Sequence, residues 1–144
     1  MKHFLLILSF ILFLLGGCDR KIHEEKIVQI SGYHWHTNID IALKLAKEQE
    51  KNIIVMVSED TCRWCIKMDE RTLIDSRVRK KLKNYILVSI KRSDKKSVAH
   101  LPTFDGNIPS FFFLEHDTDF IESIVGYYDA EPFLEYIQEI EDDV

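Results

Sequence analysis

Cysteine, proline, glycine and tryptophan are all scarce in this chain of 144 residues, and positive charge is not in surplus. Three cysteines, at positions 18, 62 and 65, are too few for a disulfide scaffold. Basic residues number 19 against 24 acidic ones, which argues against nucleic acid as a partner because phosphate binding requires a basic face. The chain has no internal repeat and no low-complexity segment. Its few cysteines therefore need a chemical explanation.

A long hydrophobic run is also missing. The apolar run from Phe4 to Leu15 is shorter than the roughly 20 residues of a membrane-spanning helix and is typical of a secretion signal. It ends in Leu15-Gly16-Gly17-Cys18, which resembles the lipobox of bacterial lipoproteins, where the cysteine is lipidated. We expect a signal peptide at 1–17, a lipidated N-terminus and tether at 18–27 and one domain at 28–144, lipid-anchored in the bacterial cell envelope and facing the periplasm or cell exterior. An ordinary cleaved signal and an uncleaved anchor are the alternatives.

With Cys18 assigned to lipid, the remaining cysteines form one pair, Cys62-Arg63-Trp64-Cys65. The pair follows an apolar run, Ile53–Val57, and opens a helical pattern. Amides at a helix N-terminus and the helix dipole favour a thiolate, and the thiolate is the attacking species in thiol–disulfide exchange. So small a disulfide loop restrains the unfolded chain little. The pattern therefore predicts redox chemistry, with a static disulfide as the less favoured interpretation.

Hydrophobic periodicity divides the chain into alternating strands and helices. This order predicts a central sheet with helices on both faces and a hairpin that adds antiparallel strands. Trp35 is expected in the core. The expected strands are 27–30, 53–58, 85–90, 110–115 and 119–125, and the expected helices are 39–50, one that begins near Cys62, 77–83, a short one around 94–100, and 130–141. The expected helix caps are Thr37 or Asn38, Asp60 or Thr61, Ser76 and Asp129.

This order, with the residues around the cysteines, resembles the thioredoxin fold over about residues 28–142. Ile108-Pro109 stands directly before a strand, where thioredoxin-like proteins carry a cis-proline against the cysteines; Leu101-Pro102-Thr103 is a competing candidate. Gly126 matches a glycine near the thioredoxin substrate groove. Trp64-Cys65-Ile66-Lys67-Met68 is closer to exported thioredoxin-like proteins. The resemblance implies an α/β thioredoxin fold with a central mixed sheet of four to five strands flanked by helices on both faces.

The resemblance also implies roles for individual residues. Cys62 would be the nucleophile, its thiolate favoured by Arg63, and Cys65 the resolving cysteine. Thioredoxin has a buried aspartate that accepts the proton of the second cysteine, but Met56 stands at that place here. Glu59, Asp60 or water would have to replace it. The implied substrate groove consists of Arg63, Trp64, Ile108, Pro109 and Gly126; Trp64 is equally compatible with a packing role.

We therefore expect a membrane-tethered thiol–disulfide oxidoreductase that reduces exported proteins and uses no cofactor or metal. Its partners would be exported protein thiols and disulfides, a membrane electron-donor protein, and the bilayer through Cys18. One alternative is a carrier of copper or another soft metal that combines the thiols with His34, His36 and His100. Another is a disulfide donor, which Arg63 favours because a stabilised thiolate makes the protein more oxidising. A non-catalytic binding module is the third.

Overall fold

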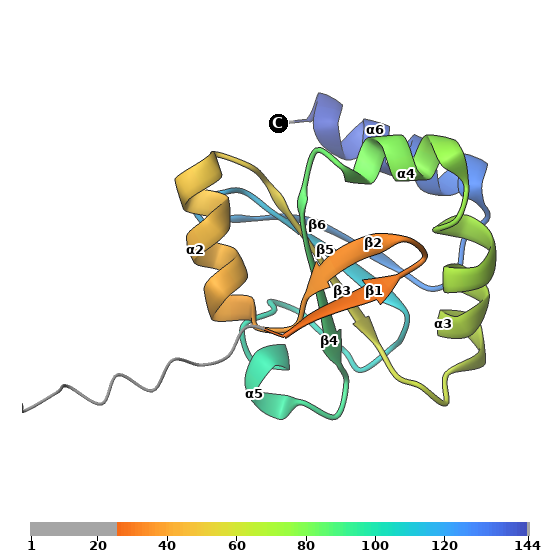
Figure 1. Cartoon of the computed structure of the whole chain (residues 1–144), viewed down its shortest axis with the longest axis horizontal. Helices are drawn as coiled ribbons and strands as arrows, with labels where there is room; N and C mark the ends of the chain where they lie inside the picture. The colour runs from red at the N-terminus through yellow and green to blue at the C-terminus, as the bar shows by residue number, and fades with distance from the viewer. Residues whose placement is uncertain (1–25, 144) are drawn as a thin grey trace, which may run out of the picture.

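The computed structural model describes residues 26–143, and its centre is a mixed sheet (Figure 1). Six strands lie in the order β1-β2-β4-β3-β5-β6, where β2, β4 and β3 run parallel and the others pair antiparallel. The central strand β3 is buried at every position, as its apolar, β-branched run predicts. The strands are β1 (Ile27–Ile30), β2 (Tyr33–His36), β3 (Ile53–Ser58), β4 (Ile86–Lys91), β5 (Ser110–Leu114) and β6 (Phe120–Val125).

The sheet has one strand more than the four to five that we expected. The additional strand is β2, which pairs with β1 through a two-residue turn. Both turn residues, Ser31 and Gly32, have positive φ, the backbone that a tight antiparallel hairpin requires. The alternation of buried Tyr33 and Trp35 with His34 and His36 identifies β2 as a strand with one inner face.

Helices cover both faces of the sheet, which confirms the predicted α/β class. On one face, α2 (Ile39–Gln49) and α5 (Lys95–Val98) enclose a core of aliphatic residues from β3 and β4 (Figure 1). The other face is covered by α3 (Arg63–Lys67), the π-helix η2 (Met68–Thr72), α4 (Ser76–Leu82) and α6 (Ala130–Asp142). Trp35 lies in this second core, as expected. Within residues 26–143, no helix is both long enough and apolar enough to cross a membrane.

Of three predicted helix caps, the structure confirms one, contradicts one and finds the third in place without its capping hydrogen bond. Asn38, one of the two candidates, caps α2, and its Oδ1 accepts hydrogen bonds from Asp40 N and Ile41 N. Ser76 does not cap α4; Asp75 does, because its carboxylate lies one residue earlier and accepts from Arg77 N at 2.8 Å. Asp129 stands at the N-cap of α6 but makes no capping hydrogen bond, and accepts one from the Tyr127 hydroxyl instead.

Candidate active site

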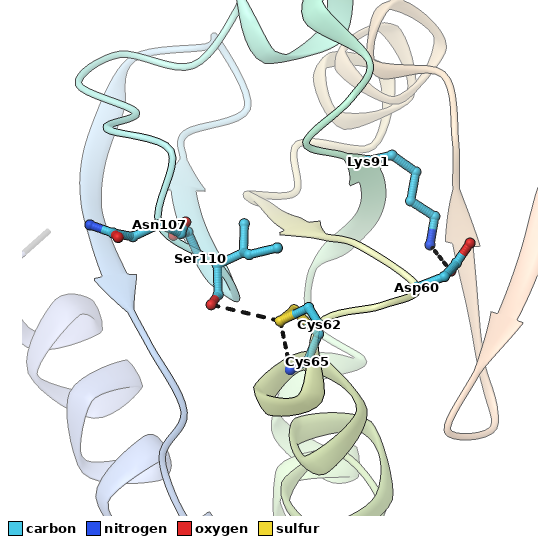
Figure 2. The surroundings of a disulfide bond; sticks show 7 residues. Asp60, Cys62, Cys65, Lys91, Asn107 and Ser110 are labelled. Carbon is cyan, nitrogen blue, oxygen red and sulfur yellow. Dashed lines mark hydrogen bonds and ion pairs between the residues drawn. A yellow bond between two sulfur atoms is a disulfide. The ribbon is translucent and has the colours of Figure 1, made fainter.

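The cysteine pair lies after the turn that connects β3 to α3, at the start of α3. A turn closes after Ser58 when Cys62 N donates to Glu59 O at 3.0 Å, and α3 begins at the next residue. Cys62 is itself the N-cap: its Sγ accepts a hydrogen bond from Cys65 N at 3.1 Å, so the expected cap at Asp60 or Thr61 is wrong (Figure 2). The sulfur therefore already occupies the position where free helix amides stabilise a thiolate.

Cys62 and Cys65 are joined by a disulfide, and they differ in exposure. Cys62 is partly exposed, whereas Cys65 is only 4% exposed and lies on the inner side of α3. A partner can reach the first sulfur directly, and it can reach the second only through the first. Arg63 is exposed beside Cys62 and has no ion-pair partner among residues 26–143.

A loop before β5 approaches the partly exposed sulfur. The Ile108–Pro109 peptide is cis, whereas the competing Leu101–Pro102 bond is not. The carbonyl oxygen of Ile108 lies 3.8 Å from Cys62 Sγ, and Pro109 is buried. Gly126 N, at the end of β6, donates to Pro109 O at 2.8 Å. The cysteines, the proline loop and the end of β6 thus form one continuous site.

A pocket of about 250 Å³ opens beside the cysteines, lined by Trp64, Ile108, Gly126 and Tyr127. Trp64 is 50% exposed and stacks on Tyr127 with ring centroids 5.6 Å apart. The Lys67 ammonium lies 4.1 Å from the centre of the Tyr127 ring. Three of the five predicted groove residues therefore line one pocket, while Arg63 and Pro109 do not. Tyr127 was missed, although an aromatic residue directly after Gly126 was the available signal.

Met56, which stands where thioredoxin has its aspartate, is buried in the core. The carboxylates expected to replace that aspartate are engaged elsewhere: Glu59 accepts from Ser93 N, and Asp60 pairs with Lys91 (Figure 2). The sequence prediction overlooked Asp69. Its Oδ1 is buried without a hydrogen-bond partner among the described residues, and burial raises the pKa of this carboxyl to about 6, with Lys91 opposing the rise.

Comparison with known families agrees with this geometry. The family model of the thioredoxin-like domain matches residues 39–141. The chain belongs to the thioredoxin-like family. No curated protein matches it.

Solved structures that resemble this thioredoxin-like chain share its fold at low sequence identity. A protein described as DsbH oxidoreductase superposes with a TM-score of 0.61 at 16% identity, covering 74% of this chain and 82% of its own. The C-terminal domain of Neisseria meningitidis DsbD, in the oxidised form, gives 0.58 at 20% identity, covering 70% and 90%. A thioredoxin from Thermus thermophilus gives 0.60 at 18% identity, covering 72% and 84%.

The predicted histidine site does not assemble in the thioredoxin-like domain. His34 and His36 lie on β2, whereas His100 Nε2 lies 3.7 Å from Asp40 Oδ1 beside α2. Within residues 26–143, no three His, Cys, Asp or Glu side chains come together as a metal site requires. Cys18 and the expected signal peptide lie outside the described residues.

Proposed function

We propose that this thioredoxin-like chain is a thiol–disulfide oxidoreductase that reduces disulfides of exported proteins. The observation that carries the proposal is the unequal pair: a partly exposed sulfur at a helix N-terminus, beside an apolar pocket, with a buried sulfur behind it. A disulfide with only a structural role would require neither a pocket beside it nor a difference in exposure between its two sulfur atoms.

The reaction moves two electrons from the pair to the substrate. The Cys62 thiolate attacks a substrate disulfide, forms a mixed disulfide and releases one substrate sulfur as a thiolate. The Cys65 thiol then loses its proton and attacks Cys62 Sγ. This second step closes the Cys62–Cys65 disulfide and releases the other substrate sulfur, which takes up a proton. The pocket beside Trp64 would hold the apolar residues that flank the substrate cysteine.

The proposed place of this reaction is the bacterial cell envelope, with Cys18 lipidated and residues 18–27 acting as the tether. The apolar run before Leu15-Gly16-Gly17-Cys18 supports this location. A reductase in an oxidising compartment needs a membrane electron donor, and we include such a donor in the proposal. The DsbD C-terminal domain, whose fold this chain shares, has been solved in an oxidised and a reduced form, which supports a redox-active pair. Replacing Cys18 by Ser should abolish incorporation of labelled fatty acid and release the protein from membranes; unchanged labelling or membrane retention would refute the anchor.

Two measurements test the redox function. Cys65→Ala should accumulate mixed disulfides on Cys62, whereas Cys62→Ala should accumulate none, because the remaining sulfur is buried. The reverse pattern would overturn the assignment. The reduction potential of the pair decides the direction. A value of about −270 mV, as in thioredoxin, supports a reductase. A value of about −120 mV identifies a disulfide donor. A pair that does not cycle between dithiol and disulfide refutes the oxidoreductase function.

A further inference from the structure

The structure points to Asp69 as the proton acceptor of Cys65, a role that thioredoxin gives to an aspartate on the strand before the pair. This inference rests on the proposed function, because it concerns the second step of that reaction. Three observations carry it: the helical position of Asp69, the contact of its backbone with the first hairpin, and a buried carboxylate oxygen that has no partner among residues 26–143.

Helical spacing places Asp69 on the same side as Cys65. The two residues are four apart, Cys65 in α3 and Asp69 in the π-helical turn η2 that continues it, and residues four apart lie on one face of a helix. The neighbours of that face confirm its direction, because Cys65, Met68 and Thr72 are all buried against the sheet. Asp69 is partly buried within this inner stripe, whereas Glu70 beside it is exposed.

The first hairpin contacts Asp69 through its backbone. The Ser31 hydroxyl, in the turn between β1 and β2, donates to the Asp69 carbonyl at 2.7 Å and holds the turn against the start of η2. On the side chain of the same residue, Oδ1 is buried without a donor among the described residues. A buried carboxylate without a donor binds a proton more readily than an ordinary aspartate. Such a group can accept a proton near neutral pH and give it back.

The charged groups that act on Asp69 come from two elements. Glu70 on η2 raises its pKa, and Lys91 at the end of β4 lowers it without cancelling the effect of burial. Lys91 is shared, since it also pairs with the exposed Asp60. The resulting pKa of about 6 lies close to neutral pH. A general base is most efficient when its pKa is near the pH at which the reaction runs. Met56 on β3 offers no competing acid.

In the resolving step, the Asp69 carboxylate takes the proton of the Cys65 thiol, and the Cys65 thiolate attacks Cys62 Sγ. The bond between Cys62 and the substrate sulfur breaks, the intramolecular disulfide forms, and the substrate sulfur leaves with the electron pair. Asp69 then returns its proton to the leaving thiolate or to water. No further reductant or oxidant enters the step.

The test follows the resolving step alone, in the full chain carrying Cys18→Ser and held in detergent. The reduced protein is mixed with an aromatic disulfide that releases a coloured thiolate. Attack by Cys62 gives the first equivalent and resolution by Cys65 the second. In the wild-type site, the rate of the second release should rise with pH through about 6, the pKa of Asp69.

Asp69→Asn should remove that rise and slow the second release roughly 10²-fold at neutral pH, the usual contribution of a general base. The first release should be unchanged. Glu70→Gln is the matched control, because it removes an equal charge from the exposed neighbour. It should keep the rise with pH and a second release at close to the wild-type rate, with the rise moved to slightly lower pH because Glu70 raises the pKa of Asp69. A second release in Asp69→Asn with wild-type rate and pH profile would overturn the role of Asp69 while leaving the oxidoreductase intact. Absence of both releases in the wild-type pair would refute the proposed function itself.

A second measurement needs no substitution at Asp69. In the reduced wild-type pair, the Cβ resonance of Cys65 should record a titration step at the pKa of Asp69, since the two groups exchange a proton. Glu70→Gln should retain this step. A Cys65 resonance that titrates in one step, with nothing near the Asp69 pKa, would show that the groups do not communicate and would overturn the inference.

Discussion

Replacing Asp69 by Asn should make the protein more stable at neutral pH and leave its stability below about pH 4 nearly unchanged. The reason is the cost of holding a buried carboxylate in its charged form. The carboxyl titrates at about 6 in the folded protein, against an ordinary value of 3.8. At about 1.4 kcal/mol for each pKa unit, this difference corresponds to about 3 kcal/mol. Because Asp69 is only partly buried, solvent reduces that figure, and we expect a gain of about 1–2 kcal/mol.

The sign follows from proton binding. Because the folded pKa lies above the unfolded one, the folded protein binds the Asp69 proton more tightly than the unfolded chain does between about pH 3.8 and 6. Raising the pH through this window therefore reduces the free energy of unfolding of the wild-type protein. Asn carries no such proton, so the difference between the two proteins should grow from zero to its full value across the same window.

Urea denaturation of the oxidised proteins at several pH values measures this difference without involving the thiols. Glu70→Gln should show little change, because its carboxylate is exposed. An Asp69→Asn protein that is destabilised at neutral pH, or a difference that does not vary between pH 4 and 7, would refute the electrostatic reasoning. A gain in stability from removing a functional group is the trade-off expected at an active site.

Three further substitutions test other parts of the site and the fold. Trp64→Ala should slow the reduction of disulfides in longer peptides more than the reduction of glutathione disulfide, and equal effects on both substrates would argue against a peptide pocket. The loss of the stack on Tyr127 should lower the free energy of unfolding by at most about 1.5 kcal/mol. Gly126→Ala should lower the free energy of unfolding by about 1–3 kcal/mol, because a φ of +105° is strained for any residue with a side chain, even though the added Cβ would meet open space. An unchanged midpoint of thermal or urea unfolding would refute this. Asp75→Ala should lower the free energy of unfolding by about 1 kcal/mol, because it removes the N-cap of α4. Ser76→Ala, at the exposed next residue, is the control, and an equal loss in both variants would show that the cap contributes nothing.

Much of the fold could be predicted because the strongest signals are local. The apolar run of β3 followed directly by Cys62 predicts a buried strand, a turn and a helix, and the structure contains them in that order. The strand β2 was missed because four residues give little periodicity. Its positive-φ turn at Ser31-Gly32 also lacks the Asn-Gly or Asp-Gly pair that marks such hairpins most clearly.

The candidate site could be predicted only in part, for a different reason. Ile108-Pro109 and Gly126 occupy places that a known fold assigns, so their positions follow from the resemblance. Asp69 could not be predicted in this way, because a carboxylate in the second turn of a helix is ordinarily solvated. Its surroundings include the β1–β2 turn, whose Ser31 hydroxyl bonds to the Asp69 carbonyl from 38 residues earlier in the chain. Long-range contacts of this kind leave no trace in the spacing of one helix.

The placement of the two tryptophans gives this protein a pair of separate optical reporters. Trp35 is fully buried in the core, with its indole N–H donating to Ile30 O, so its emission follows the folding of the first hairpin. Trp64 is half exposed between the cysteines, so its emission follows the redox state of the pair and the filling of the pocket. A chain with Trp35→Phe would therefore report the reaction, and one with Trp64→Phe would report unfolding, in the same solution conditions.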